Sequence, residues 1–279
     1  MKPTLINLDD YVVAGEGANG VSYNHKSDPT IMLKIYFRNY EAAELELEHA
    51  QKVFNAGIPT PEPGDLITDG ERLGIRFRRI EGKKSYARAV GDDPAHTEDY
   101  AREFAEMCKQ LHQTELDTKQ FRSVKEQYLY LLEKNEFFTA TQKQKISDFV
   151  KNAPEASTAI HGDLQFGNGI FVDKDGKREK YFIDLGDFTY GYKMFDLGMV
   201  YLTCKLNDEE FTKSAFHMDN ATAARFWDAF APAYFGPDAD FDSIEKEIRI
   251  YAGLKTLIVE RDTMRPMPGF RAMLEGTIY

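Results

Sequence analysis

The chain has 279 residues, of which 42% are hydrophobic and 29% are charged, and its formal net charge is −11. This length is enough for one large domain or two modest ones with a buried core. The acidic balance argues against binding to nucleic acid or to an anionic membrane surface, because both need a basic surface. No apolar run approaches the roughly 18–20 residues of a membrane span, and we find no secretory signal.

The two cysteines, Cys108 and Cys204, both stand in apolar segments with helical periodicity. This context favours buried free thiols in a reducing compartment over a disulfide. Together with the absence of a signal segment, it leads us to expect a cytoplasmic protein.

Residues 5–37 have the pattern of three strands joined by tight connections. The first two strands flank a glycine-rich loop that contains Gly15, Gly17 and Gly20. A dinucleotide site would have a helix directly after such glycines. Here a strand follows instead, so the loop is interpreted as a flap that covers phosphates with its backbone N–H groups.

Lys34 interrupts the apolar third strand, and it has two readings. An edge-strand lysine commonly extends its ammonium to solvent. Alternatively, the ammonium holds phosphates and is itself held by a carboxylate of the helix predicted over residues 40–56. On that helix Glu41, Glu44 and Glu48 recur at helical spacing, which by itself is typical of a solvated face. Either Glu44 or Glu48 is placed to reach Lys34.

Residues 66–68 and 73–80 have the pattern of two further strands around an Asp-Gly turn, and they complete a small antiparallel sheet. The strand pattern ends at Ile80, so we predict an N-terminal lobe of residues 1–80 and a C-terminal lobe of residues 81–279. The second lobe reads as mainly helical, with a final helix over residues 244–261. Its aromatic cluster is interpreted as core, with one wall of an acceptor pocket as the alternative, and His112 as a core or capping histidine. The cluster comprises Phe226, Trp227, Phe230, Tyr234 and Phe235.

Residues 160–184 carry the strongest chemical signal in the chain. A polar loop with His161, Asp163 and Asn168 precedes two short strands joined by a turn at residues 173–176, and the second strand leads to Asp184. Oxygen ligands from Asn168 and Asp184 on adjacent hairpin arms suit Mg²⁺, which takes few protein ligands and keeps several waters. Asp163 is then available to receive a proton from a nucleophile. A lone H-x-D is common in ordinary turns, so the weight lies on the whole string.

The string H-G-D-x-x-x-x-N with the downstream I-D-L-G resembles the aminoglycoside phosphotransferase and choline kinase-like superfamily, the small-molecule relatives of protein kinases. Gly162 stands where protein kinases usually have arginine, and the span from Asp187 to Asp196 is too short for an activation segment. A protein kinase is therefore disfavoured. The resemblance implies an α+β, protein-kinase-like bilobal fold, with a small antiparallel sheet and one helix in the N-lobe and a larger helical C-lobe.

The resemblance also implies site roles. ATP, or alternatively GTP, would bind with Mg²⁺, the phosphates would lie on Lys34 and under the glycine loop, and the metal would lie on Asn168 and Asp184. Asp163 would orient the acceptor hydroxyl and accept its proton. Glu48 is preferred over Glu44 as the partner of Lys34, because the family places this glutamate about three turns before a Pro-x-Pro element, here residues 59–61.

Two other carboxylates lie near these motifs. The resemblance implies that Asp196, at the start of a predicted helix, supports the catalytic loop, and its position also suits capping of that helix. Asp187 has two open roles, at the acceptor site or behind the metal ligands. Gln165 departs from the family pattern, which often has histidine or lysine there, so this position supplies no charge.

The sequence thus predicts a phosphotransferase that moves the γ-phosphate of ATP to a hydroxyl of a small molecule, such as an aminoglycoside, choline or a sugar. The alternative is a nucleotide-binding pseudokinase that serves as a binding module. The acceptor and the oligomeric state are left open by the sequence, because specificity groups lie in the variable helical part of such folds.

Overall fold

The computed structural model describes residues 2–17, 20–37 and 40–279. Its internal contacts divide the chain into two units. The first runs up to Ser85 and also includes Asn168–Asp187, and the second consists of Tyr86–Gly167 and Phe188–Tyr279. This differs from the predicted division at residue 80, chiefly because the later hairpin belongs with the N-terminal segment. The physical reason is a long-range strand pairing that local sequence patterns do not reveal.

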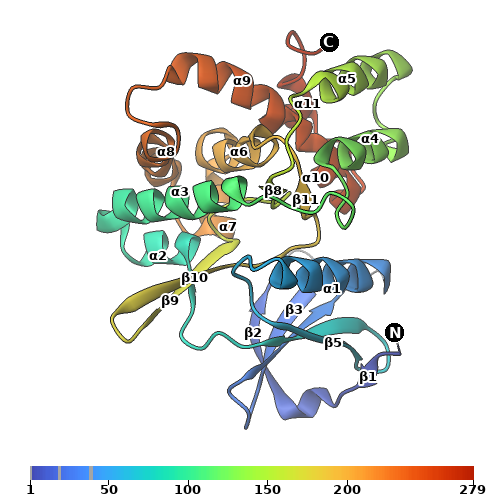
Figure 1. Ribbon diagram of the computed structural model, residues 1–279, viewed down its shortest axis with the longest axis vertical. Coiled ribbons are helices and arrows are strands. Elements are labelled where there is room, and N and C mark those ends of the chain that lie inside the picture. Colours follow the sequence, from blue (N-terminus) through green and yellow to red (C-terminus); the bar gives the residue numbers. More distant parts are fainter. Residues whose placement is uncertain (1, 18–19, 38–39) are drawn as a thin grey trace. The chain divides into compact units, whose positions relative to one another are not determined.

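The first unit contains a six-stranded sheet, drawn in blue and cyan in Figure 1. The strand order is β1-β5-β6-β4-β3-β2, and every neighbouring pair is antiparallel except β1 with β5. A short 3₁₀ turn, η1 (Leu8–Asp10), precedes β2. The strands are β1 (Thr4–Leu5), β2 (Tyr11–Glu16), β3 (Gly20–His25), β4 (Ile31–Tyr36), β5 (Pro63–Thr68) and β6 (Leu73–Arg78).

Alternation along β4 gives the sheet two different faces, since successive side chains of a strand point to opposite sides. Leu33 and Ile35 are 0% and 1% exposed and pack with Ile67 in one apolar cluster. Met32 and Lys34 therefore lie on the other face. Helix α1 (Tyr40–Asn55) follows β4 and contacts β5 and β6.

The hairpin of the first unit is formed by β9 (Gly169–Lys174) and β10 (Lys177–Phe182). Its two connecting residues, Asp175 and Gly176, both have positive φ, as a type I′ Asp-Gly turn requires. Strand β7 (Lys84–Ser85) pairs with β9 and makes a three-stranded sheet. This pairing explains why the hairpin belongs to the first unit.

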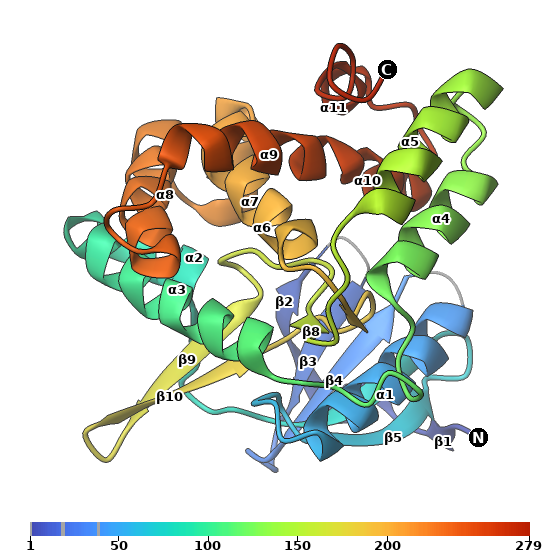
Figure 2. The same cartoon turned by 45° about the horizontal axis from the view of Figure 1, so that its top comes forward.

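The second unit is mainly helical, and α3 and α8 lie side by side in it (Figures 1 and 2). Strands β8 (Ala159–Ile160) and β11 (Thr189–Tyr190) form a small antiparallel pair. The helices are α2 (Tyr86–Asp92), η2 (Pro94–His96), α3 (Thr97–Gln113), α4 (Val124–Lys134), α5 (Ala140–Asn152), α6 (Met194–Tyr201), the π-helical η3 (Leu202–Leu206), α7 (Glu209–Phe216), α8 (Asn220–Phe235), α9 (Phe241–Leu254), α10 (Thr256–Thr263) and α11 (Pro268–Ala272).

The prediction of one continuous final helix over residues 244–261 is wrong, because the structure has two helices there. Helix α9 ends at Leu254 and α10 begins at Thr256, as Figure 2 shows. At the junction the N–H of Lys255 bonds to the carbonyl of Ala252, three residues back, at 3.1 Å. This tighter turn interrupts the regular helical ladder. The break places the side chain of Lys255 in the protein interior.

The core of the second unit confirms the aromatic prediction in most of its members. Phe226, Trp227, Phe230 and Tyr234 are buried, and Phe235 is half-buried. The rings of Phe230 and Tyr234 stack with centroids 5.7 Å apart. Aromatic pairs of this kind contribute beyond their buried area.

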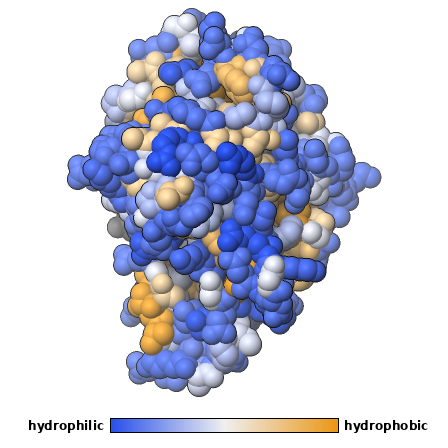
Figure 3. Space-filling model, turned by 90° about the vertical axis from the view of Figure 1, so that its left-hand side faces the viewer, coloured by the Kyte–Doolittle hydropathy of each residue, from blue (hydrophilic) through white to orange (hydrophobic). Residues whose placement is uncertain are grey.

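Both cysteines are buried free thiols, as expected. Burial raises the pKa of Cys108 and of Cys204, so neither is a reactive thiolate. None of the described helices combines the length and apolar composition that a bilayer crossing requires. The face drawn in Figure 3 is mostly hydrophilic with small apolar patches, in keeping with the high content of charged residues.

Candidate active site

Lys34 lies at the centre of the polar site in the first unit. Its Nζ donates to both carboxylate oxygens of Glu46, at 2.9 and 2.7 Å, and to Oδ1 of Asp184 at 2.9 Å. The side chain is only 18% exposed, so the solvent-directed reading of this lysine is wrong. Burial by itself lowers the pKa of Lys34, but the Asp184 and Glu46 carboxylates outweigh it and raise the pKa well above its usual value. The ammonium therefore keeps its charge at neutral pH.

The predicted partner Glu48 is wrong, and so is the alternative Glu44. Glu48 is exposed and accepts a hydrogen bond from Lys52 at 2.5 Å, while Glu46 is 5% exposed. The reason is helical geometry. Each residue of a helix turns by about 100°, so Glu46 lies on roughly the opposite side from both other glutamates.

The signal that locates Glu46 is the apolar stripe of α1, not its acidic spacing. Ala43, Leu47, Ala50 and Val53 are buried at intervals of three and four residues, which mark the inward face. Glu46 is the carboxylate on that face. Tyr36 on β4 also donates its hydroxyl to Glu46, and burial raises the pKa of this tyrosine.

Asn168 and Asp184 lie at one end of the β9–β10 hairpin. Gly169 pairs with Phe182, and the N–H of Ile183 bonds to the carbonyl of Asn168 at 3.0 Å. Asp184 follows with φ of 63°, a left-handed backbone that is uncommon for a residue other than glycine and that often marks a functional constraint. One amide and one carboxylate in this position form a donor set that suits Mg²⁺.

His49 is a residue of this region that sequence reasoning missed. Its Nδ1 lies 3.2 Å from the carbonyl of Leu185 and 3.0 Å from that of Gly186, directly after Asp184. Burial is the main cause that lowers the pKa of His49, so the neutral ring donates through Nδ1. The signal was its spacing: it stands three residues after Glu46 on the same side of α1.

The glycine loop divides into two kinds of position. A Cβ at Gly20 would lie 2.2 Å from the carbonyl oxygen of Ile35, so packing alone requires glycine there. A Cβ at Gly15 would meet no atom within 4 Å, and one at Gly17 only the Gly20 carbonyl at 4.0 Å. The tip residues Ala18 and Asn19 lie outside the described residues. Packing therefore requires glycine at position 20, whereas it does not require glycine at positions 15 and 17.

The predicted catalytic loop, of which residues 161–167 belong to the second unit, is held by Asp196. This fully buried carboxylate accepts hydrogen bonds from the backbone N–H of His161 at 2.7 Å and of Gly162 at 2.8 Å. The predicted support of the loop by Asp196 is confirmed. Its expected capping role is not, because its oxygens bind the loop instead of the first turn of α6. Burial raises the pKa of Asp196, but the hydrogen bond from His112 and the nearby charge of Lys255 outweigh it and lower the pKa overall.

His112 is a core histidine, as predicted, and it connects Asp196 to α8. Its Nε2 lies 3.0 Å from Asp196 Oδ2 and its Nδ1 lies 2.7 Å from the hydroxyl of Tyr234. The arrangement fits a ring that donates a hydrogen bond from Nε2 to Asp196 and accepts one at Nδ1 from the Tyr234 hydroxyl. Burial is the main cause that raises the pKa of Tyr234, which keeps its hydroxyl a donor.

Asp163 is half-buried, and its N–H lies 3.3 Å from Nδ1 of the buried His161. Gln165, the departure from the family pattern, turns its Oε1 back onto the N–H of Gly167 at 2.5 Å. The side-chain amide thus braces the loop locally. Lys255, which sequence reasoning also missed, donates from Nζ to the carbonyl of Gly162 at 2.7 Å.

The structure brings Lys34 together with Asp184, and it places Asn168 beside the strand that leads to Asp184. Asp163 belongs to the second unit, where its loop is held by hydrogen bonds to Asp196 and from Lys255. Within the described residues, histidine, cysteine and acidic side chains form no cluster of three or more that could hold a metal.

A family model described as "Phosphotransferase enzyme family" matches residues 12–232. The matched range includes the glycine loop, Lys34 and the whole catalytic loop, and it ends before Lys255. No curated protein matches the sequence.

Solved structures show the same fold at low identity. A thermostable mutant of aminoglycoside phosphotransferase APH(4)-Ia, in ternary complex with AMP-PNP and hygromycin B, matches with a TM-score of 0.63 at 13% identity, over 96% of this chain and 95% of that one. The gentamicin complex of APH(2")-IIa gives 0.56 at 14%, over 97% and 92%. A choline/ethanolamine kinase family protein from Mesorhizobium loti gives 0.53 at 17%, over 95% and 84%. The fold is therefore the predicted α+β, protein-kinase-like one.

Proposed function

This chain belongs to the phosphotransferase enzyme family, and from that premise we propose that it transfers the γ-phosphate of ATP to a hydroxyl group of a small molecule. The observation that carries the proposal is the triad of Lys34, Glu46 and Asp184, in which one largely enclosed ammonium is held by two carboxylates at 2.7–2.9 Å. An ammonium fixed in this way, on the sheet face away from the apolar cluster, is suited to hold a polyphosphate.

In this proposal the first unit neutralises charge. Phosphoryl transfer passes through a loose, charge-rich transition state, so catalysis consists mostly of positioning and electrostatic stabilisation. Lys34 contacts the phosphates, and the backbone around Gly15 and Gly17 covers them. Asn168 and Asp184 are the residues that would hold Mg²⁺, which when bound supplies positive charge to the phosphate oxygens.

The second unit supplies the proton acceptor in this proposal. Asp163 receives a hydrogen bond from the acceptor hydroxyl, orients it toward the phosphorus and takes its proton late in the transfer. The hydroxyl oxygen forms the new bond to phosphorus as the bond from phosphorus to the leaving ADP oxygen breaks, and the hydroxyl proton passes to Asp163. The anchoring of this loop by Asp196 supports the assignment, since a base must be held in place to orient its substrate.

We propose a cytoplasmic location, because ATP and two free buried thiols both suit a reducing compartment. The acceptor is proposed only as a hydroxyl-bearing small molecule. The structures with the same fold include complexes of gentamicin and of hygromycin B and a choline/ethanolamine kinase family protein. Their compounds define the first assay panel.

The test is an ADP-release assay with Mg²⁺ and either ATP or GTP, run against aminoglycosides, choline, ethanolamine and sugars. We expect one compound to raise nucleotide consumption above the level without acceptor and to yield a phosphorylated product by mass spectrometry. Asp163→Asn should lower kcat by about 10²–10⁴-fold, as loss of a general base does. Its thermal shift with ATP and Mg²⁺ should persist.

Two outcomes oppose the proposal. A thermal shift with ATP and Mg²⁺ but no consumption with any acceptor would favour the pseudokinase alternative. An Asp163→Asn variant with unchanged kcat would remove the assigned base while leaving the family membership intact.

A further inference from the structure

Lys255 is a buried cation that the proposed chemistry does not yet use. It stands at the junction between α9 and α10, its residue is 1% exposed, and its Nζ donates to the carbonyl oxygen of Gly162 at 2.7 Å. The position lies beyond the range matched by the family model. It nevertheless contacts the residue directly before Asp163.

The partners of this ammonium are unusual for a buried charge. Its hydrogen bond goes to a backbone carbonyl, that of Gly162, and its Nζ lies 5.7 Å from the ring centroid of Tyr128. A buried charge is costly unless it is paired and hydrogen-bonded. Burial lowers the pKa of Lys255, but Tyr128, Asp196 and Asp163 outweigh this effect and raise the pKa overall, so the group is charged.

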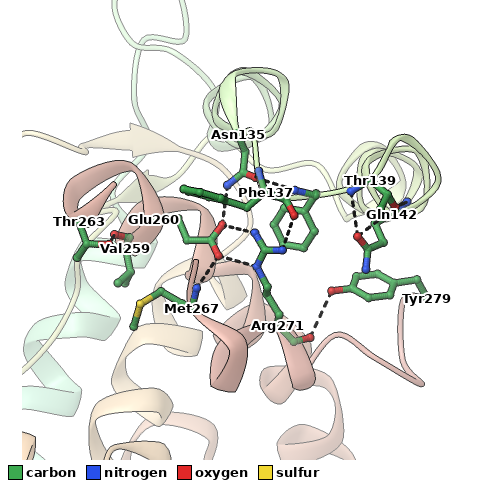
Figure 4. Close-up of polar contacts among 11 residues, drawn as sticks. Asn135, Phe137, Thr139, Gln142, Val259, Glu260, Thr263, Met267, Arg271 and Tyr279 are labelled. Carbon is green, nitrogen blue, oxygen red and sulfur yellow. Dashed lines mark hydrogen bonds and ion pairs between the residues drawn. The ribbon is translucent and has the colours of Figure 1, made fainter. Parts of the chain in front are cut away.

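An ion pair of the same unit, between the half-buried Arg271 and the buried Glu260, shows what ordinary compensation looks like. In Figure 4, Arg271 meets Glu260 with two hydrogen bonds, from Nε to Oε1 at 2.6 Å and from Nη2 to Oε2 at 2.9 Å. The Glu260 carboxylate also accepts hydrogen bonds from Nδ2 of Asn135 at 2.7 Å and from the N–H of Met267 at 2.8 Å. This clamp ties the C-terminal segment to the turn after α4 and contacts no residue of the catalytic loop.

The carbonyl that Lys255 binds belongs to the peptide group that carries the backbone of Asp163. That peptide group is held at both ends, since its carbonyl oxygen accepts from Lys255 and its N–H lies 3.3 Å from His161 Nδ1. The preceding peptide group is held by Asp196 at 2.8 Å through the Gly162 N–H. Gly162 has φ of 86° and intrinsically broad freedom, so external contacts must fix it.

We propose that Lys255 is a positioning residue for Asp163: by holding the Gly162 carbonyl, with its charge near the loop, it fixes the direction from which the Asp163 carboxylate meets the acceptor hydroxyl. This inference rests on the proposed function for its catalytic consequence. Its structural part, that Lys255 holds the loop, stands independently. Misplacement of a catalytic group by about 1 Å is enough to cost about 100-fold in rate.

The test compares Lys255→Met, which removes the charge and the donor at similar length, with Arg271→Met as the matched control. Both remove a cation of the second unit, which is buried at Lys255 and half-buried at Arg271; Lys255 bonds to Gly162, whereas Arg271 bonds to Glu260 and Phe137. The first readout is amide hydrogen exchange of residues 161–164. We expect exchange there to speed up by about 10-fold or more in Lys255→Met and to stay at the wild-type rate in Arg271→Met, which opens the C-terminal segment instead.

The second readout separates kcat from the nucleotide KM. We expect Lys255→Met to lower kcat by about 10–100-fold with a nucleotide KM within about two-fold of wild type. Lys255→Gln, which keeps a neutral donor, should recover part of the protection and part of kcat. Arg271→Met should keep kcat at a temperature where both variants are folded.

The inference is overturned if the exchange of residues 161–164 in Lys255→Met matches that in Arg271→Met, or if the two variants lose the same fraction of kcat. A wild-type protein that phosphorylates no acceptor would refute the proposed function instead. In that case the exchange comparison still decides whether Lys255 holds the loop.

Discussion

Replacement of Glu46 by Gln tests the register of helix α1 and the function of Lys34 together. The wild-type carboxylate accepts two hydrogen bonds from Lys34 and one from Tyr36, and its side chain is 6% exposed. Gln keeps the shape and one oxygen acceptor but removes the charge. Lys34 then retains a single carboxylate partner, Asp184, at 2.9 Å.

The expected loss of stability follows from these contacts. A hydrogen bond to a charged group contributes about 1.5–3 kcal/mol, and Gln at position 46 weakens two such bonds from Lys34. Two effects limit this loss of stability. The variant no longer has to bury the charge of Glu46, and Lys34 keeps its contact with Asp184. We therefore expect the free energy of unfolding to fall by about 1.5–3 kcal/mol, as measured by urea denaturation.

The matched control is Glu48→Gln on the outer face of the same helix. Glu48 is 58% exposed and pairs with Lys52 four residues later, so its replacement should cost only about 0.3–0.5 kcal/mol. In the ADP-release assay Glu46→Gln should lower kcat/KM by about 100-fold, because Lys34 loses the group that orients it. Glu48→Gln should stay within about two-fold of wild type. Equal losses in the two variants would refute the assignment of the inward face of α1.

Three further predictions concern other parts of the molecule. Asp196→Asn should destabilise the protein by about 3–5 kcal/mol, because the buried N–H donors of the loop lose their charged acceptor. Calorimetry measures this loss of stability. Gly20→Ala should cost about 1–3 kcal/mol through its overlap with the neighbouring strand, whereas Gly15→Ala should fold normally and change only nucleotide binding, as thermal shifts with and without ATP would show. Burial raises the pKa of Glu260, but hydrogen bonds from Arg271 and other donors outweigh it and lower the pKa, so its stabilisation is present above the unfolded value near 4.5 and is lost as pH falls through the folded value. Arg271→Met should therefore be less stable than wild type at pH 7, with a difference that shrinks below about pH 4.5 in denaturation curves.

Local signals were sufficient for most of the first unit. Period-two alternation, Asp-Gly turns and the apolar stripe of α1 depend on neighbours a few residues away, so the strands and the helix are close to their predicted positions. The catalytic loop was recognised because its chemistry is compressed into 25 residues from Ile160 to Asp184. The grouping of β9 and β10 with the first unit was not predictable in this way. It depends on the pairing of Lys84 and Ser85 with Phe171 and Ile170, which are far apart in the sequence.

The error at Glu48 has a different origin. Glutamates at positions 41, 44 and 48 form a regular acidic series, but regular acidic spacing marks a solvated face of a helix. The partner of Lys34 had to lie on the buried face, among Ala43, Leu47 and Ala50. The available signal was therefore Glu46, the one glutamate in this stretch that does not follow the spacing of positions 41, 44 and 48.

Lys255 shows that the argument applied to Lys34 also applies elsewhere in the chain. Both lysines stand in apolar segments; Lys34 is half-buried and Lys255 is buried, and enclosing a cation in this way is costly. Lys34 is compensated by two carboxylates, whereas Lys255 is held mainly by one carbonyl and an aromatic ring. A fold selected for stability alone would place an apolar side chain at position 255, since such replacements of buried charges are often neutral or stabilising. The proposed positioning of Asp163 gives a reason for a cation against the Gly162 carbonyl, and the exchange experiment on residues 161–164 measures whether Lys255 holds the loop.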